Sequence, residues 1–241
     1  MKPYYDDGLA RIYHGDCREV LGELPRDTAD AIVTDPPYGQ NYVSNRGTMG
    51  GVVGDDGTLD VPAALVLACR ALRRGRHAYI FGRFDLSTTP LTAAVELVWD
   101  KQIIGMGNLS LPWSESHEPI TFAVYELSAA NRAKGYGRLA ARMRQGSVIR
   151  CQRVQSGEAT HPTQKPVPLL RQLIESSSVM GELVLDPFMG SGSTLVAATL
   201  EDRRSIGIEV EERYCEIAAK RLARGASGAA LQTGWLKGEG P

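Results

Sequence analysis

The chain is 241 residues long, which is enough for one large α/β domain with a substantial buried core. Its composition, 43% hydrophobic and 23% charged, excludes collagen-like, coiled-coil and low-complexity classes. The longest apolar run, Val61 to Cys69, has about half the length of a membrane-spanning helix, so we expect no membrane partner. The net charge is −1, from 27 basic and 28 acidic residues, so any affinity for a polyanion must be local.

The N-terminal segment and the cysteines indicate a cytoplasmic protein without a bound metal. Residues Met1 to Gly8 are polar and acidic, unlike an export signal. His14 and His161 lack partners at metal-ligand spacing. The cysteines are too far apart in sequence for a disulfide framework or paired metal ligands, and we expect them to be reduced: Cys17, Cys69, Cys151 and Cys215.

Short apolar segments alternate with helical ones along the chain. Seven have the β-branched or aromatic composition of strands: Ala10 to His14, Asp30 to Thr34, His77 to Phe81, Leu97 to Lys101, Pro119 to Tyr125, Glu182 to Leu185 and Ser205 to Ile208. Four have apolar residues at intervals of three and four, as helices do: Val61 to Arg73, Val167 to Ser178, Ser193 to Glu201 and Glu211 to Arg224. The alternation predicts a Rossmann-like α/β fold, in which about seven mostly parallel strands are covered by helices on both faces. Ligands of such sheets bind at the carboxyl ends of the strands.

Two stretches interrupt this alternation within what we expect to be a single domain spanning residues 1–241. Residues 39–58 contain six glycines and directly follow a strand, which predicts a long, mobile loop that is either a functional lid or disordered. Residues 129–157, part of an expected insertion at about 126–160, carry seven basic residues and no acidic one. These basic residues are Arg132, Lys134, Arg138, Arg142, Arg144, Arg150 and Arg153. The glycine-rich residues 226–241 are expected to fray.

The segment Thr34-Asp35-Pro36-Pro37-Tyr38 includes the end of an apolar strand and the residues that follow it. Two successive prolines fix φ and remove two backbone donors, so the Asp35 carboxylate and nearby carbonyl groups form a hydrogen-bond acceptor site. Such a site suits an amino group, and Tyr38 offers a flat face on which a ring can stack. The alternative is a proline-rich turn in which Asp35 caps a helix.

A second candidate site lies between an apolar strand and a helix, at residues 185–194. Gly190 and Gly192 let the backbone approach a ligand closely, and Glu209 at the end of the next strand is placed to bind ribose hydroxyls. No lysine follows Gly192 as in a phosphate-binding loop, and Leu195 stands where a dinucleotide fingerprint has its third glycine. The pattern therefore indicates a nucleoside pocket. A tight turn whose glycines only serve packing is the alternative.

Together the two motifs resemble those of the DNA amino-methyltransferases, which transfer a methyl group from S-adenosyl-L-methionine to an exocyclic nitrogen. Asp35-Pro36-Pro37-Tyr38 precedes the cofactor motif, as in the beta class of that family, and the resemblance extends from about Ile12 to Leu222. It implies the methyltransferase version of the Rossmann-like fold, with the tetrapeptide as catalytic motif. It also implies cofactor contacts by Asp16, Cys17, Thr163, Lys165, Asp186, Pro187, Phe188, Gly190, Gly192, Thr194 and Glu209.

The resemblance gives the supporting residues separate tasks. Asp16 corresponds to the partner of the amino group of the cofactor's adenine, and Thr163 and Lys165 correspond to residues that face its methionine end. A helix cap is the alternative for Asp16, and a solvated side chain is the alternative for Lys165. Trp99-Asp100-Lys101 and His117-Glu118 also resemble family positions, and we interpret them as framework.

The implied reaction is direct methyl transfer without a covalent enzyme intermediate or a metal. The amino nitrogen of a base is a poor nucleophile because its lone pair is delocalised into the ring. Asp35 and the Pro36 carbonyl would accept the two amino hydrogens and direct the lone pair toward the sulfonium methyl group. A base in double-stranded DNA must first be flipped out, at a cost of roughly a few kcal/mol that stacking on Tyr38 partly offsets.

The basic stretch matches the target-recognition region of the family in position, so we expect its cations to contact DNA phosphates. A solvated charged face is the alternative. The region is short, which indicates a short recognition sequence, loose specificity, or help from residues 39–58 or from a second subunit in a homodimer. The sequence leaves open whether a cognate restriction endonuclease is a partner.

Adenine is the favoured base, because adenine-specific members usually begin the tetrapeptide with Asp and cytosine-N4 members more often begin it with Ser. An N4-cytosine DNA methyltransferase is the main alternative. An RNA or protein-amide methyltransferase is a less favoured alternative, because such enzymes more often begin the tetrapeptide with Asn. A nucleotide-binding oxidoreductase is disfavoured because the third glycine of the dinucleotide fingerprint is missing. A non-catalytic DNA-binding protein with a vestigial pocket is the remaining alternative.

Overall fold

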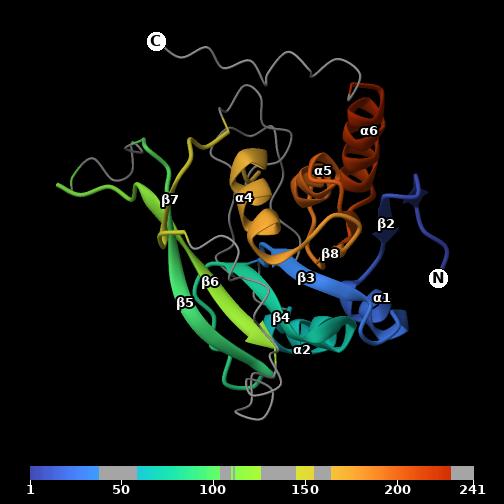
Figure 1. Cartoon of the computed structure of the whole chain (residues 1–241), viewed down its shortest axis with the longest axis horizontal. Helices are drawn as coiled ribbons and strands as arrows, with labels where there is room; N and C mark the ends of the chain where they lie inside the picture. Colours follow the sequence, from blue (N-terminus) through green and yellow to red (C-terminus); the bar gives the residue numbers. More distant parts are fainter. Residues whose placement is uncertain (38–58, 104–109, 111, 126–144, 155–163, 229–241) are drawn as a thin grey trace.

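A mixed sheet with helices on both faces forms the framework of the protein, as the computed structural model shows (Figure 1). The model describes residues 1–37, 59–103, 110, 112–125, 145–154 and 164–228. In chain order the strands are β1 (Tyr5–Asp6), β2 (Ala10–His14), β3 (Ala29–Thr34), β4 (Leu72–Phe81), β5 (Leu91–Asp100), β6 (His117–Tyr125), β7 (Val148–Arg150), β8 (Leu183–Asp186) and β9 (Arg204–Glu209). The helices are α1 (Cys17–Glu23), α2 (Val61–Ala71), α4 (Val167–Ser177), α5 (Ser193–Leu200) and α6 (Glu212–Gly228).

The order of the strands across the sheet is β1-β2-β9-β8-β3-β4-β6-β5-β7. The five strands from β2 to β4 are parallel to one another, whereas β6 runs antiparallel to both β4 and β5. From β3 the chain moves through α2 to β4 on one side, and from β8 it moves through α5 to β9 on the other. The order therefore reverses between β3 and β8, which is where a doubly wound sheet forms its ligand crevice.

The core lies on both faces of the central strands, and β3 is buried at every position. Ile32 of β3 packs in the cluster that α1 and α2 form on one face. Its neighbour Val33 packs with residues of α4 and α5 on the opposite face. Successive strand residues point to opposite faces, so the apolar run Ala31-Ile32-Val33 is what a strand covered on both sides requires. Figure 1 shows α4, α5 and α6 on one side of the sheet and α1 and α2 on the other.

Each of the seven predicted strands and four predicted helices overlaps an observed element, and the sheet is larger than predicted. β1 and β7 add two and three residues, which are too few to give an alternating pattern. The short helix α1 was also not among the predicted helices. The predicted helix Val61 to Arg73 ends at Ala71, because Leu72 and Arg73 belong to β4, where Arg73 pairs with Asp30.

Several predictions concern segments at the margin of the described structure. The predicted loop 39–58 lies outside the described residues. Residues 226–228 were predicted to fray but belong to α6, which continues to Gly228, and residues 229–241 lie outside the described residues. Within the described ranges, no helix combines the length and apolar character that crossing a membrane demands.

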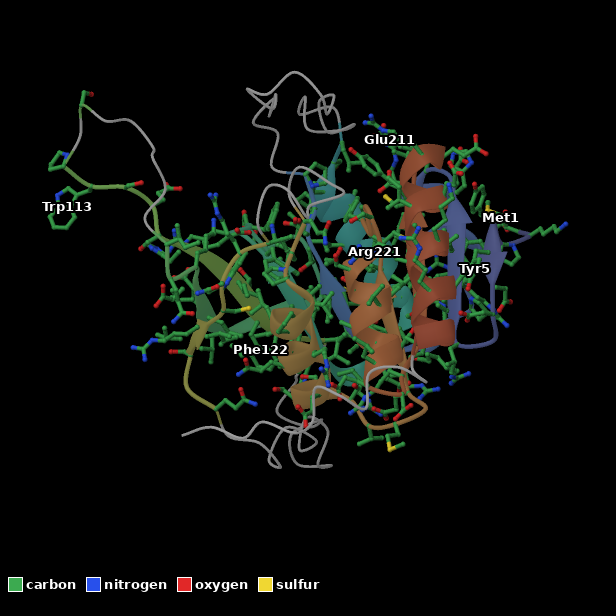
Figure 2. All side chains as sticks on the ribbon, turned by 90° about the horizontal axis from the view of Figure 1, so that it is seen from above. Met1, Tyr5, Trp113, Phe122, Glu211 and Arg221 are labelled. Carbon is green, nitrogen blue, oxygen red and sulfur yellow. The ribbon has the colours of Figure 1, made fainter. Side chains whose placement is uncertain are left out.

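Trp113 lies between β5 and β6, 86% exposed and far from the helices (Figure 2).

Candidate active site

The two predicted motifs begin at neighbouring points of the sheet. β3 ends at Thr34 and the adjacent parallel strand β8 ends at Asp186. The Thr34 hydroxyl donates a hydrogen bond of 2.8 Å to Asp186 Oδ1, and both side chains are buried. Asp35, Pro36 and Pro37 directly follow Thr34, the last residue of β3. The acceptor motif and the glycine-rich loop therefore meet at the switch point of the sheet.

Asp186 shapes the loop that follows it. Its Oδ1 also accepts a hydrogen bond of 3.1 Å from the backbone N–H of Phe188, and the Thr194 side chain is a further partner. Burial raises the pKa of Asp186 to about 6, although the hydrogen bonds from Thr194 and Thr34 act in the opposite direction; the negative charge of Asp35 raises it further. With 3% of its surface exposed, Asp186 fixes the start of the loop from inside the protein.

Glu209, at the end of β9, holds the same loop from the other side. Its Oε2 accepts a hydrogen bond of 3.0 Å from the Gly190 backbone N–H, and its Oε1 accepts one of 2.8 Å from the Glu211 N–H. Burial raises the pKa of Glu209 to about 7, against the lowering effect of these hydrogen bonds. A carboxylate oxygen has two lone pairs, so each oxygen can accept a further hydrogen bond from a ligand.

Helix α6 supports the last residues of the loop. Gly192 precedes α5 with φ of 77°, in the left-handed region, and a Cβ at this position would lie 2.7 Å from Ala218 Cβ on α6. Arg221 of the same helix, labelled in Figure 2, donates hydrogen bonds to the Ser191 carbonyl (2.6 Å) and the Ser193 hydroxyl (3.2 Å). The loop is thus held against α6 at a distance that only glycine permits at position 192.

Asp35 is held by a buried lysine. Lys165 Nζ lies 2.7 Å from Asp35 Oδ2 and 2.8 Å from Glu118 Oε1, and it lies 4.9 Å from the centre of the Phe81 ring. Burial lowers the pKa of Lys165, but the two carboxylates outweigh it, so the pKa lies above its ordinary value. Lys165 is 8% exposed, so the alternative of a solvated lysine is wrong.

Asp16 and Cys17 lie at the end of β2, beside the end of β9. Asp16 is the N-cap of α1: its Oδ1 accepts a hydrogen bond of 2.8 Å from the Arg18 backbone N–H, and its Oδ2 lies 2.6 Å from Arg18 Nη2. Cys17 begins the helix and is buried. The Gly15 N–H donates to the Glu209 carbonyl oxygen. The capping role considered for Asp16 is therefore present, at the same sheet edge as Glu209.

Several predicted site residues lie outside the described part of the chain. They are Tyr38, Thr163, Arg132, Lys134, Arg138, Arg142 and Arg144. Of the other predicted DNA contacts, Arg150 and Arg153 are both exposed, and Arg150 Nε lies 3.7 Å from Asp100 Oδ2. In the described ranges no group of His, Cys, Asp or Glu side chains forms a metal site.

Sequence reasoning missed three residues that the structure places in this region. Glu118 was interpreted as framework, although it binds the lysine that holds Asp35. Arg221 and Thr34 were given no task. A hydroxyl residue directly before the acceptor motif was visible in the sequence, but its partner Asp186 lies 152 positions away. No local pattern indicates such a contact.

The sheet whose switch point brings the acceptor motif and the glycine-rich loop together has the Rossmann-like fold of the methyltransferases. The chain belongs to the DNA methylase family of N6/N4 methyltransferases, whose model matches residues 29–220. M2.DpnII from Streptococcus pneumoniae, a type II methyltransferase, is 29% identical over an alignment of 250 positions, and the alignment covers 92% of this chain and 92% of that protein. The protein is thus a DNA methyltransferase, and S-adenosyl-L-methionine is its cofactor.

Solved structures show the same fold. The complex of M1.HpyAVI with S-adenosyl-L-methionine has a TM-score of 0.66 at 23% identity, over 89% of this chain and 99% of that chain. PvuII DNA methyltransferase, which is cytosine-N4-specific, has a TM-score of 0.68 at 16% identity, over 91% of this chain and 88% of its own. The fold is therefore shared between this protein and an N4-cytosine enzyme.

Proposed function

We propose that the protein methylates the N6 amino group of adenine in double-stranded DNA, after the base has been flipped out of the helix. The adjacency of the two motifs carries this proposal. Thr34, directly before Asp35, is hydrogen-bonded to Asp186, which begins the glycine-rich loop. A base held at Asp35 and a cofactor held by the loop would then face each other across one strand boundary, as direct transfer requires.

The residues around the loop fit S-adenosyl-L-methionine, which supplies a methyl group on a sulfonium centre when bound. Glu209 is a half-buried carboxylate that accepts a hydrogen bond from the Gly190 backbone N–H, and it suits the ribose hydroxyls. Asp16 and Cys17 lie at the neighbouring strand end, where we assign the adenine of the cofactor. The remaining proposed contacts are made by Thr163, Asp186, Pro187, Phe188, Gly192 and Thr194.

The acceptor motif supplies what the amino group needs. The Asp35 carboxylate and the Pro36 carbonyl each accept a hydrogen bond from one N–H of the amino group, which localises the lone pair on nitrogen. Pro37 contributes no competing backbone donor because it has no N–H. Tyr38 stacks on the flipped base. Each of these groups acts by position and charge, so the mechanism requires no nucleophilic side chain.

The choice of adenine depends on Asp35. Among the DNA amino-methyltransferases that the sequence resembles, an Asp at the first position of the tetrapeptide is typical of adenine-specific members. The alternative is the N4 amino group of cytosine, and the PvuII enzyme, which shares the fold, is cytosine-N4-specific. Both bases present an amino group with the same hydrogen-bonding capacity.

The basic residues are proposed to hold the DNA backbone. Arg150 and Arg153 are exposed on and after β7, beside the end of β5. We assign the same role to Arg132, Lys134, Arg138, Arg142 and Arg144. Contacts to phosphates would position the duplex without selecting a sequence.

Identifying the product tests the proposal. The purified protein is incubated with S-adenosyl-L-methionine and unmethylated DNA of mixed sequence, and the digested nucleosides are analysed by mass spectrometry. We expect N6-methyladenosine in its deoxy form. N4-methylcytosine would establish the alternative base, and methylation of RNA without methylation of DNA would contradict the proposal.

A further inference from the structure

Four alternating charges form a chain of contacts beside the acceptor motif. Asp35 binds Lys165, Lys165 binds Glu118, and Glu118 Oε2 lies 3.2 Å from Lys101 Nζ. These residues come from four separate segments: the end of β3, the turn before α4, the second residue of β6 and the position after β5. Residues spread over about 130 positions thus converge on one carboxylate of the proposed catalytic motif.

The free energy of folding does not by itself explain why Lys165 is buried. A buried ammonium is costly to desolvate, and an ion pair in the interior often contributes no more than apolar residues of the same volume would. Here the ammonium has two carboxylate partners and the face of Phe81. Such complete satisfaction fixes the position of the charge closely.

Glu118 is suited to hold Lys165 in place. Although burial raises its pKa, Lys165 and Lys101 lower the pKa of Glu118 below its ordinary value overall. Glu118 therefore stays ionised, and its two oxygens each have a lysine partner. With Asp35 included, the four groups carry no net charge. Asp186 is a further titratable group that acts electrostatically on Asp35.

We infer that Lys165 is a positioning residue for methyl transfer, which orients the Asp35 carboxylate toward the target amino group and stabilises its negative charge. Glu118 and Lys101 hold the ammonium at this place. The inference rests on the proposed function, because it needs Asp35 to contact the target base. It gives the Lys165 ammonium a task different from the cofactor contact that the resemblance implies.

Single-turnover methyl transfer tests this assignment with Lys165→Met. We expect the rate constant at saturating DNA and cofactor to fall about 100-fold, which is the size of loss that a displaced catalytic group causes. The dissociation constant for S-adenosyl-L-methionine should change less than about threefold, because the cofactor is held elsewhere. Lys165→Arg, which keeps the charge, should recover most of the rate.

The matched control is Lys220→Met on the exposed face of α6, where the lysine also has a carboxylate partner, Glu216. This variant should keep the rate of the unaltered protein. If Lys165→Met does not unfold cooperatively, Lys165→Gln takes its place, whereas a folded variant that no longer binds cofactor would overturn the inference. Its neutral amide, one bond shorter than the lysine side chain, also removes the positive charge, and the same loss of rate is expected.

A double-mutant cycle shows whether Lys165 acts through Asp35. Asp35→Asn removes the charge that Lys165 is inferred to hold, so adding Lys165→Met should slow this variant less than about threefold further. A full 100-fold loss in both backgrounds would overturn the inference, as would a folded Lys165→Met enzyme with the unaltered rate. Failure of the unaltered protein to methylate DNA would instead overturn the proposed function.

Discussion

Glu209 is a half-buried carboxyl group whose charge responds to pH in the neutral range. Burial raises its pKa to about 7, so without a ligand the carboxyl group is about half protonated at neutral pH. The folded protein binds this proton more tightly than the unfolded chain does. The contribution of Glu209 to the free energy of unfolding therefore falls as the pH rises from the ordinary pKa of a glutamate to about 7. Hydrogen bonds from ribose hydroxyls would favour the ionised form.

Binding of a nucleoside should therefore tighten as Glu209 ionises. We expect the affinity for 5′-methylthioadenosine, which lacks the titratable methionine groups, to rise about tenfold between pH 6 and pH 8. Isothermal titration calorimetry at several pH values measures it. Glu209→Gln should bind more weakly and without this pH dependence. An unchanged pH dependence in that variant would assign the effect to another group.

Among the elements, α6 and the glycine-rich loop depend on each other. Gly192 has a positive φ and its missing side chain leaves room for Ala218, while Arg221 binds the loop from the same helix. Hydrophobic pattern alone predicted both α5 and α6, because each has apolar residues at helical spacing. The pattern did not indicate that α6 contacts the glycine-rich loop, because this contact depends on how α5 and α6 pack against each other.

Replacing Gly192 with alanine should disturb this contact. We expect Gly192→Ala to lower the free energy of unfolding by about 2–4 kcal/mol, from backbone strain and the overlap with Ala218. Urea unfolding measures the loss. The matched control is Gly22→Ala in α1, where a Cβ would meet nothing within 4 Å and a helical alanine should be neutral or stabilising by about 1 kcal/mol. Equal stability of the two variants would contradict the role given to position 192.

The sheet shows which elements a sequence pattern can predict. The central strands β3, β8 and β9 each have a largely buried, β-branched or aliphatic middle, so their existence and parallel direction followed from the alternation with helices. β1 and β7 depend on pairing with β2 and β5 for their existence, and their own residues give no periodic signal. Tertiary pairing decided these elements.

At the scale of the whole molecule, charge is balanced overall and uneven locally. The net charge of −1 gives no general attraction to DNA, whereas residues 129–157 carry seven cations. If five of them contact phosphates, the logarithm of the DNA association constant should fall with the logarithm of the salt concentration with a slope of about −4 to −5. Fluorescence anisotropy over a salt series measures this slope. A flat dependence would exclude the basic stretch as the DNA contact.

The candidate site was only partly predictable from the sequence. Asp35 and Glu209 could be found because each follows an apolar strand, and parallel strands place their carboxyl ends at one edge. The partners of Lys165 could not be found in this way. Asp35 and Glu118 lie 130 and 47 positions away from it, and only the completed fold brings these three side chains together.

The central claim is that the acceptor motif at the end of β3 performs chemistry on a base beside a cofactor held by the loop after β8. Asp35→Ala tests it most directly, through single-turnover transfer of labelled methyl groups to DNA together with calorimetric binding of S-adenosyl-L-methionine. We predict a loss of transfer of at least about 1,000-fold with cofactor affinity kept within about threefold. Transfer at the rate of the unaltered protein in a variant that binds cofactor normally would contradict the account.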